Sequence, residues 1–289
     1  MPSPITIRPV RPADLKECAR IMQQAFARIA TRHGFAPDFP SVETVMPLME
    51  FMGNHPAVYG VVAEADGKIV GSNFMDCRDA IHAVGPITVD PDQQARGIGR
   101  KLMRAVLDHS KDAIGIRLVQ EAYNTASMSL YTSLGFDTRE PLAMLIGKPQ
   151  GRASGKGEAR PMRQEDLAAC AQLCNRIHGV DRQNELADSL KMFRPFVLTR
   201  DGRVVAYASA PTFWPLNHGV SETDQDMQDL LLGAAAANQD PIALLLPTRQ
   251  SSLFRWCLSS GLRMIKPMTL MSMGRYQEPT GPFYPSVAY

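Results

Sequence analysis

The chain has 289 residues, of which 45% are hydrophobic and 21% charged, and a formal net charge of +2. These values are typical of a folded globular protein, and the weak charge excludes the basic field of a nucleic-acid or anionic-membrane binder. The length fits two compact domains. The N-terminus has no apolar signal region and the apolar stretch 230–237 is too short to span a bilayer, so we expect a cytoplasmic protein.

The cysteines and histidines predict neither disulfides nor a metal site. The five cysteines are odd in number and do not have the spacing of a disulfide framework. Cys170 and Cys174 are four positions apart and are expected to pack on one helix face. There is no CxxC pair or HExxH motif, and the six histidines are scattered.

The first predicted elements are a helix and a hairpin. The sequence RPVRPADL at 8–15 opens a helix, with Asp14 as a carboxylate of its first turn. The segment 59–71 predicts two strands joined at Asp66-Gly67, a pair that favours the positive φ of a tight hairpin turn.

A strand, a glycine-containing loop and a helix are predicted over 84–107. The β-prone run 87–89 is ended by Pro91, and Gln94, Gly97 and Gly99 lead into a helix. The free N–H groups of a first helical turn and the close approach that glycines permit make this arrangement an anion site. Cationic side chains add charge beside it; they are Arg96, Arg100 and Lys101.

A further strand at 116–120 precedes the motif N-x-x-S-x-x-L-Y-x-x-L-G-F at 124–136. The motif predicts a helix that a left-handed glycine, Gly135, stops before another strand.

The rest of the chain repeats these features in the same order. The segment 149–157 is rich in glycine and polar residues and is expected to be a linker. Three later segments then resemble earlier ones: 160–167 resembles 8–15, 196–206 resembles 59–71, and 256–262 resembles 130–136. We therefore interpret the chain as two copies of one α/β unit, at 1–148 and 158–289.

The pattern Q-x-x-G-x-G at 94–99, together with the motif at 124–136, resembles the GNAT superfamily of N-acetyltransferases. The resemblance covers 5–148 and, more weakly, 158–275. It implies an α/β (α+β) fold of two tandem GNAT-like domains. Each would be a mixed, mostly antiparallel and splayed sheet flanked by helices.

The same resemblance implies acetyl-CoA as co-substrate and no metal. The family's loop amides bind the pyrophosphate, here those of Gln94, Ala95, Arg96, Gly97, Ile98 and Gly99, with Arg100 beside them. The backbone of Ile87, Thr88 and Val89 would pair with the pantetheine arm as an added strand. Asn124 and Ser127 would also lie at the cofactor.

For the reaction, the resemblance implies that Tyr131 protonates the leaving thiolate and that the Val89 N–H binds the carbonyl oxygen. No motif fixes the general base, which takes a proton from the amine. Glu121 at the end of its strand is our first choice and His82 the second, while Asp76 also lies near the cleft.

The second copy is expected to have lost its cofactor site. No Q-x-x-G-x-G occurs between 210 and 242, and Cys257 stands where Tyr131 stands in the first copy. The tail 276–289, rich in proline and aromatic residues, is expected either to lie on the domain interface beside the acceptor or to be a loose terminus.

These expectations together predict transfer of an acetyl group from acetyl-CoA to a primary amine of a small molecule, by direct attack in a ternary complex. Two alternatives stay open: a non-catalytic acyl-CoA-binding or sensing protein, and a protein or peptide N-acetyltransferase. Because two fused copies can replace a dimer of single domains, we expect a monomer or a weak homodimer.

Overall fold

The computed structural model describes residues 4–94 and 96–288 of the chain. The N-terminal half contains seven strands and four helices among these residues. Its strands are β1 (Thr6–Pro9), β2 (Val58–Ala65), β3 (Lys68–Asp76), β4 (Ile81–Val84), β5 (Thr88–Val89), β6 (Gly115–Glu121) and β7 (Asp137–Gly147). Its helices are α1 (Leu15–Arg32), α2 (Val42–Asn54), α3 (Ile98–His109) and α4 (Thr125–Ser133), with 3-10 turns η1 (Pro12–Asp14) and η2 (Pro91–Gln93).

The C-terminal half repeats this order after an irregular segment, 148–157. Its strands are β8 (Glu158–Pro161), β9 (Phe196–Arg200), β10 (Arg203–Ala208), β11 (Gly219–Ser221), β12 (Ile242–Pro247), β13 (Arg263–Gly274) and β14 (Phe283–Tyr284). Its helices are α5 (Leu167–His178), α6 (Gln183–Met192), α7 (Asp224–Ala237) and α8 (Ser251–Ser259), with η3 (Gln164–Asp166) and η4 (Trp214–Leu216). The division into domains at 148 and 158 stays a prediction.

The repeat that the sequence predicts recurs in local geometry. Arg8 pairs with Asp14 at 2.6 Å, and Arg160 pairs with Asp166 at 2.7 Å. Both hairpin turns take positive φ at Asp-Gly, with Asp66 at 51° and Asp201 at 50°. The glycines that follow α4 and α8 also have positive φ. The same residue types therefore produce the same turns twice.

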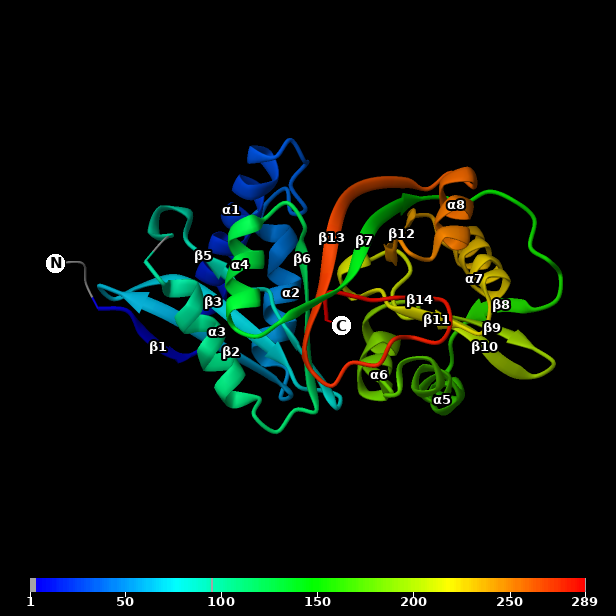
Figure 1. Cartoon of the computed structure of the whole chain (residues 1–289), viewed down its shortest axis with the longest axis horizontal. Helices are drawn as coiled ribbons and strands as arrows, with labels where there is room; N and C mark the ends of the chain where they lie inside the picture. The colour runs from blue at the N-terminus through cyan, green and yellow to red at the C-terminus, as the bar shows by residue number, and fades with distance from the viewer. Residues whose placement is uncertain (1–3, 95, 289) are drawn as a thin grey trace.

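The two halves share one sheet. The larger sheet has the order β1-β2-β3-β4-β6-β13-β7-β12, with β5 also paired to β3. Of its described pairs only β4 and β6 run parallel. Strand β13 of the C-terminal half lies between β6 and β7 of the N-terminal half, and β7 reaches across to β12 (Figure 1). The expected mixed, mostly antiparallel sheet with flanking helices is confirmed, but the halves complete each other's sheet.

The second sheet belongs to the C-terminal half and has the order β14-β11-β10-β9-β8. Helices α5 and α7 pack against it, and their apolar faces build two of the hydrophobic cores. Cys170 and Cys174 are fully buried on α5, as their spacing predicts.

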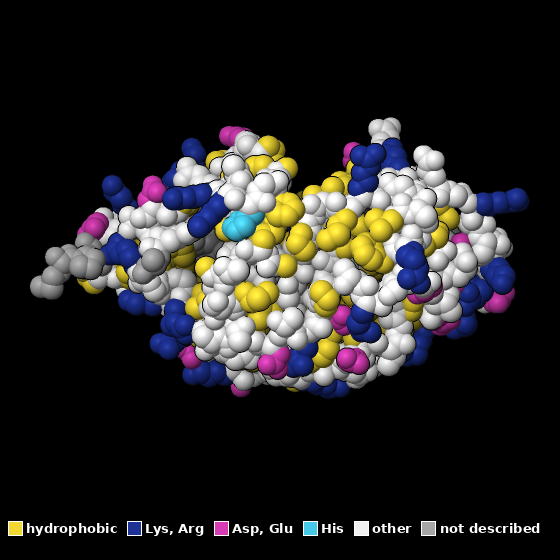
Figure 2. Space-filling model, turned by 45° about the horizontal axis from the view of Figure 1, so that its top comes forward, with side chains coloured by type: hydrophobic (Ala, Val, Ile, Leu, Met, Phe, Trp, Pro, Cys, Tyr) yellow, Lys and Arg dark blue, Asp and Glu magenta, His cyan; other side chains and the backbone are white. Residues whose placement is uncertain are grey.

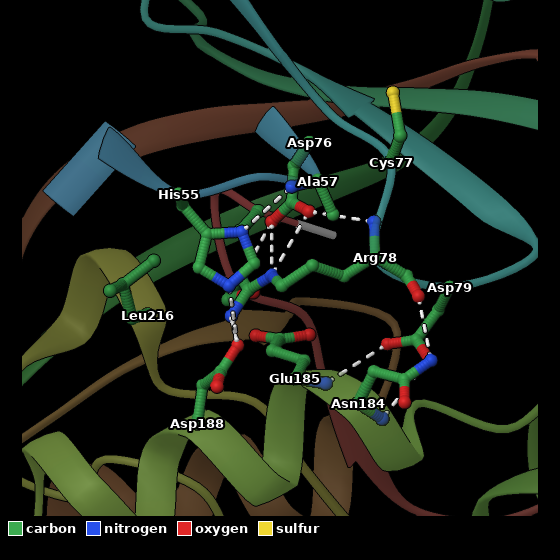
Figure 3. Close-up of polar contacts among 12 residues, drawn as sticks. His55, Ala57, Asp76, Cys77, Arg78, Asp79, Asn184, Glu185, Asp188 and Leu216 are labelled. Atoms are coloured by element: carbon green, nitrogen blue, oxygen red, sulfur yellow. Dashed lines mark hydrogen bonds and ion pairs between the residues drawn. The ribbon is translucent and has the colours of Figure 1, made fainter. Parts of the chain in front are cut away.

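A largely buried ion-pair cluster joins the two halves. Arg78, in the turn after β3, contacts Asp76 of its own half and Asp188 on α6, at 2.5 and 3.2 Å (Figure 3). Nε2 of His55 lies 3.1 Å from the same Asp188 carboxylate. The Arg78 side chain is only 5% exposed, so these contacts are shielded from water and orient α6 against β3.

Asp79 gives the same junction a second contact. Its two carboxylate oxygens accept the backbone N–H groups of Asn184 and Glu185, each at 3.1 Å. These donors belong to the first turn of α6, whose N–H groups have no partner within the helix. A carboxylate of one half therefore caps a helix of the other, as Figure 3 shows.

Candidate active site

The site begins where two parallel strands separate. Strands β4 and β6 pair over only three positions, from Ile81 opposite Gly115 to Ala83 opposite Arg117. Beyond that point, β5 stays paired with β3, whereas β6 stays paired with β13. The facing edges at 84–89 and 118–121 are thus left open between them, which is the splay that the family resemblance implies.

A groove of about 530 Å³ lies beside the open edge of β5. Helices α1, α3 and α4 form its other walls. The residues predicted for cofactor binding that line it are Ile87, Thr88, Val89, Gln94, Gly97, Ile98, Gly99, Arg100, Asn124 and Ser127, and Tyr131 joins them. Ala95 lies outside the described residues. Arg96 is exposed, is not part of the lining and hydrogen-bonds Gln93 at 2.5 Å.

The loop before α3 has the backbone geometry of an anion site. Gly97 is the residue before the helix and takes a left-handed conformation, φ 73°, which glycine adopts without strain. The N–H of Lys101 donates to the carbonyl of Gly97, so the earlier N–H groups of the first turn have no partner inside the helix. Apart from its chain neighbours, no described residue has an atom within 4 Å of where a Gly97 Cβ would be, so the space above the loop is open.

Two arginines on α1 face the same groove and were missed in the sequence analysis. Arg28 and Arg32 line it together with Ala25 and Ile29. The spacing of four between the arginines, next to the apolar Ala25 and Ile29, could have indicated a shared helix face. They bring cationic charge to the groove, and Arg28 also pairs at 3.1 Å with Asp92, in the turn before the α3 loop.

The open edge of β5 also carries the expected oxyanion donor. The N–H of Asp90 donates to the carbonyl of Val70 on β3 at 2.9 Å. Because N–H groups alternate between the two edges of a strand, the N–H of Val89 points away from β3 and toward the splay.

A second, smaller cavity of about 120 Å³ continues from the groove. Both are lined by Phe26, Ile87, Asn124, Ser127 and Tyr131. Asn124 is fixed there because its Oδ1 accepts the N–H of Ser127 at 3.2 Å and so caps α4. The shared wall means that one group bound in the groove and another in the cavity would meet at Tyr131.

Tyr131 is 6% exposed and packs edge-to-face on Phe136, with ring centroids 6.3 Å apart. Burial raises the pKa of Tyr131 to about 12, because an apolar environment disfavours the charged phenolate. The hydroxyl therefore carries its proton at neutral pH.

Glu121 lies in the smaller cavity within an ion-pair cluster that spans both halves. Its Oε1 is 2.8 Å from Nζ of Lys266 on β13, and the same ammonium is 2.6 Å from Oδ2 of Asp38. All three side chains line the cavity. Oε2 of Glu121 is buried and makes no hydrogen bond of normal geometry among the described residues, although the buried hydroxyl of Tyr123 interacts with the same carboxylate.

The structure does not bring His82 to this cavity. Its Nδ1 lies 3.0 Å from Oγ of Ser110 at the end of α3, and His82 lines neither the groove nor the smaller cavity. Burial lowers the pKa of His82. The alternation of β4 places its side chain toward α3, which the sequence could not reveal without knowing where the splay begins. Asp76 is likewise held by Arg78, outside both lining sets.

The C-terminal tail occupies the corresponding splay of the second half. Strand β14 pairs with the edge of β11, Phe283 opposite Val220 and Tyr284 opposite Gly219, and it lies beside β12 (Figure 1). Gln250 precedes α8 as Asn124 precedes α4, and its carboxamide both donates to the carbonyl and accepts the N–H of Phe283. Cys257 is fully buried in the core.

The tail then reaches the smaller cavity of the first half. Val287 donates its N–H to the carbonyl of Pro215 at 2.8 Å and lines the cavity with Trp214, Pro215 and Met268. The C-terminal half therefore supplies one side of this cavity.

Among the described residues there is neither a metal-binding group of side chains nor a helix that could span a membrane. No three or more His, Cys, Asp and Glu side chains among them are grouped so that they could hold a metal ion. None of the described helices has the length and apolar character needed to cross a bilayer.

Hydrophobic side chains gather near the middle of the face in Figure 2, while Lys and Arg are scattered over it.

Comparison with known proteins identifies relatives of the N-terminal half. Residues 56–138 match the sequence model of the family described as "Acetyltransferase (GNAT) domain". The N-alpha-acetyltransferase RimI of Mycobacterium tuberculosis is 31% identical over 140 residues, which cover 46% of this chain and 78% of that protein. The protein YqkA of Bacillus subtilis (UPF0157) is 36% identical over 82 residues, 28% of this chain. The chain spans only 24% of YqkA.

A solved structure matches both halves together. A putative acetyltransferase from Pyrococcus horikoshii superposes with a TM-score of 0.75 at 16% identity, covering 98% of this chain and 94% of that one. At this identity the similarity establishes the fold over the whole length, including the second half that the family model does not reach.

Proposed function

The chain belongs to the GNAT family of acetyltransferases, and from that premise we propose that it moves an acetyl group from acetyl-CoA to a primary amine of a small molecule. The observation that carries the proposal is the meeting of a 530 Å³ groove and a 120 Å³ cavity at Tyr131. One space would hold the acyl donor and the other the amine, in a ternary complex.

The groove fits acetyl-CoA by its donor set. The left-handed Gly97 and the open first turn of α3 offer N–H groups to a diphosphate, and Arg28, Arg32 and Arg100 would balance its charge. The free edge of β5 offers backbone groups to an amide-bearing arm. When bound, acetyl-CoA supplies a thioester whose acetyl carbon accepts the amine.

Three groups of the chain then have roles in the transfer. The Val89 N–H binds the carbonyl oxygen as negative charge develops on it. Tyr131, neutral because burial raises its pKa to about 12, donates its proton to the departing thiolate. Oε2 of Glu121, which makes no hydrogen bond of normal geometry among the described residues, accepts a proton from the amine directly or through water. His82 has no part, since it lies against Ser110.

The size and walls of the cavity favour a small acceptor. Trp214, Pro215 and Val287 of the C-terminal half close one side of it. Since an engineered apolar cavity of about 150 Å³ holds one benzene, 120 Å³ suits the reactive end of a small amine.

Calorimetric titration with acetyl-CoA tests the cofactor site. Gly97→Val places a side chain in the open space above the loop, so we expect at least about a 10-fold loss of affinity as the loop no longer approaches the diphosphate. Gly202→Val is the matched control, because Gly202 has the same φ of 73° and the same open surroundings in the other half. Equal affinity in both variants would contradict the assignment.

Release of free thiol in the presence of an amine panel separates the enzyme from a sensor. The enzyme releases coenzyme A in proportion to the acetylated amine formed, as mass spectrometry of the products would detect. Tight acetyl-CoA binding without thiol release from any amine would instead support an acyl-CoA-binding protein.

A further inference from the structure

The smaller cavity contains buried polar groups that the acetyl transfer itself does not use. Gln120, on β6 beside Glu121, lines it. The Gln120 side chain is 6% exposed, yet neither its Oε1 nor its Nε2 has a hydrogen-bond partner among the described residues. Buried amides are almost always hydrogen-bonded, so an unpartnered pair of donor and acceptor in a cavity indicates a ligand that supplies the complement.

A ligand group that satisfies both the donor and the acceptor of the Gln120 carboxamide must itself be neutral and carry an acceptor beside a donor. A carboxamide of the ligand meets this requirement, because its carbonyl accepts from Nε2 while its N–H donates to Oε1. A carboxylate could accept from Nε2 but would leave Oε1 without a donor.

The charges around the cavity also discriminate between these groups. Glu121 and Asp38 contribute two carboxylates, and Lys266 contributes one ammonium. Lys266 is already bound by both carboxylates and lies 5.2 Å from the centre of the Trp214 ring, so it is not directed at a ligand anion. The cluster carries a net charge of −1, which attracts an ammonium and repels a carboxylate.

Resting on the proposed function, we propose that the acceptor is a compact amino amide, a primary amine with a neutral carboxamide next to it on a short apolar body. Because neighbouring side chains of a strand point to opposite faces, Oε2 of Glu121 binds the amine on the face of β6 that it shares with Met268, and Gln120 binds the carboxamide on the other face, across the splay. Met268 and Val287 contact the apolar part. The site thereby discriminates against free amino acids of the same size.

Three matched acceptors test this on the full chain with acetyl-CoA, by thiol release. They are L-alaninamide, L-alanine and 3-methylbutan-2-amine, which replaces the carboxamide by an isopropyl group of the same shape. With rates corrected for the fraction of free amine, we expect kcat/KM for the amide to exceed both others by at least about 10-fold, since each competitor leaves buried polar groups unpaired.

Gln120→Leu should remove that preference. Its kcat/KM for L-alaninamide falls at least about 10-fold while that for 3-methylbutan-2-amine stays or rises. The thermal stability of Gln120→Leu should be unchanged or higher, because an apolar side chain replaces an amide without hydrogen-bond partners. The fall in kcat/KM would then not result from misfolding. Gln164→Leu, at an exposed glutamine, is the control and should keep the wild-type preference.

The outcomes separate this inference from the proposed function. Transfer to all three amines at similar kcat/KM, or an unchanged preference in Gln120→Leu, overturns the amino-amide assignment and leaves the acetyltransferase standing. Absence of transfer to any amine, despite acetyl-CoA binding, overturns the acetyltransferase itself. An alanyl peptide turned over faster than L-alaninamide would overturn the compact acceptor in favour of a peptide N-terminus.

Discussion

The ammonium of Lys266 lies 2.8 Å from Oε1 of Glu121, although the two residues belong to opposite halves of the chain. Lys266 is on β13, which the C-terminal half inserts beside β6. The proposed base is therefore held in place by the C-terminal half.

Replacing Lys266 with methionine should destabilise the fold strongly. The Lys266 and Glu121 side chains are 1% and 4% exposed, and removing one partner of such a pair costs roughly 3–5 kcal/mol because the remaining carboxylate is buried and uncompensated. Urea unfolding measures the change. Lys111→Met is the control: its pair with Asp108 is mostly exposed, so a change within about 1 kcal/mol is expected. Similar losses in both variants would refute the structural role of Lys266.

Tyr131→Phe should lower kcat by roughly 10²–10⁴-fold with little effect on acetyl-CoA affinity, as expected for loss of a general acid. Because burial raises the pKa of Tyr131 to about 12, the wild-type rate should show no alkaline decline from this residue below about pH 11. Steady-state kinetics across pH test both points. Tyr59→Phe makes the same change outside both cavities and should be neutral.

One molecule of acetyl-CoA should bind per chain. In the second half the edge of β11 is already paired with β14, and Gln250 holds the Phe283 backbone. Calorimetric stoichiometry measures this directly, and a value of two would contradict it.

Phe283→Ala should lower the free energy of unfolding by about 3–5 kcal/mol, because the Phe283 ring is 1% exposed.

Acid should weaken the fold through His218. Burial, reinforced by Arg182, lowers the pKa of His218 to about 4, although Glu185 opposes the shift. As pH falls from about 6.5 toward 4, the unfolded histidine gains a proton that the folded one does not, so stability falls by up to about 1.4 kcal/mol per pH unit from this group. The slope of unfolding free energy against pH should be smaller in His218→Gln. An identical slope would exclude this histidine as the cause.

Local sequence signals predicted the parts of the site that lie close together in the chain. The loop glycines, the β5 edge, Asn124 and Tyr131 all line one groove, because each belongs to a short strand–loop–helix motif whose geometry the residue types dictate. Lys266 and Trp214 were missed as cavity residues because they reach it through tertiary packing. His82 and Arg28 depend on which way a strand or helix faces, which periodicity alone left open.

The insertion of β13 has a consequence for synthesis of the protein. Gly115 pairs with Gly274. The Arg117 side chain donates to the carbonyl of Arg275, which lies 158 positions after Arg117 in the sequence. A chain emerging from the ribosome therefore cannot finish the sheet around its acetyl-transfer centre until almost all of it has been translated. Such distant pairing also slows folding, so the nascent N-terminal half must wait with the edges of β6 and β7 uncovered.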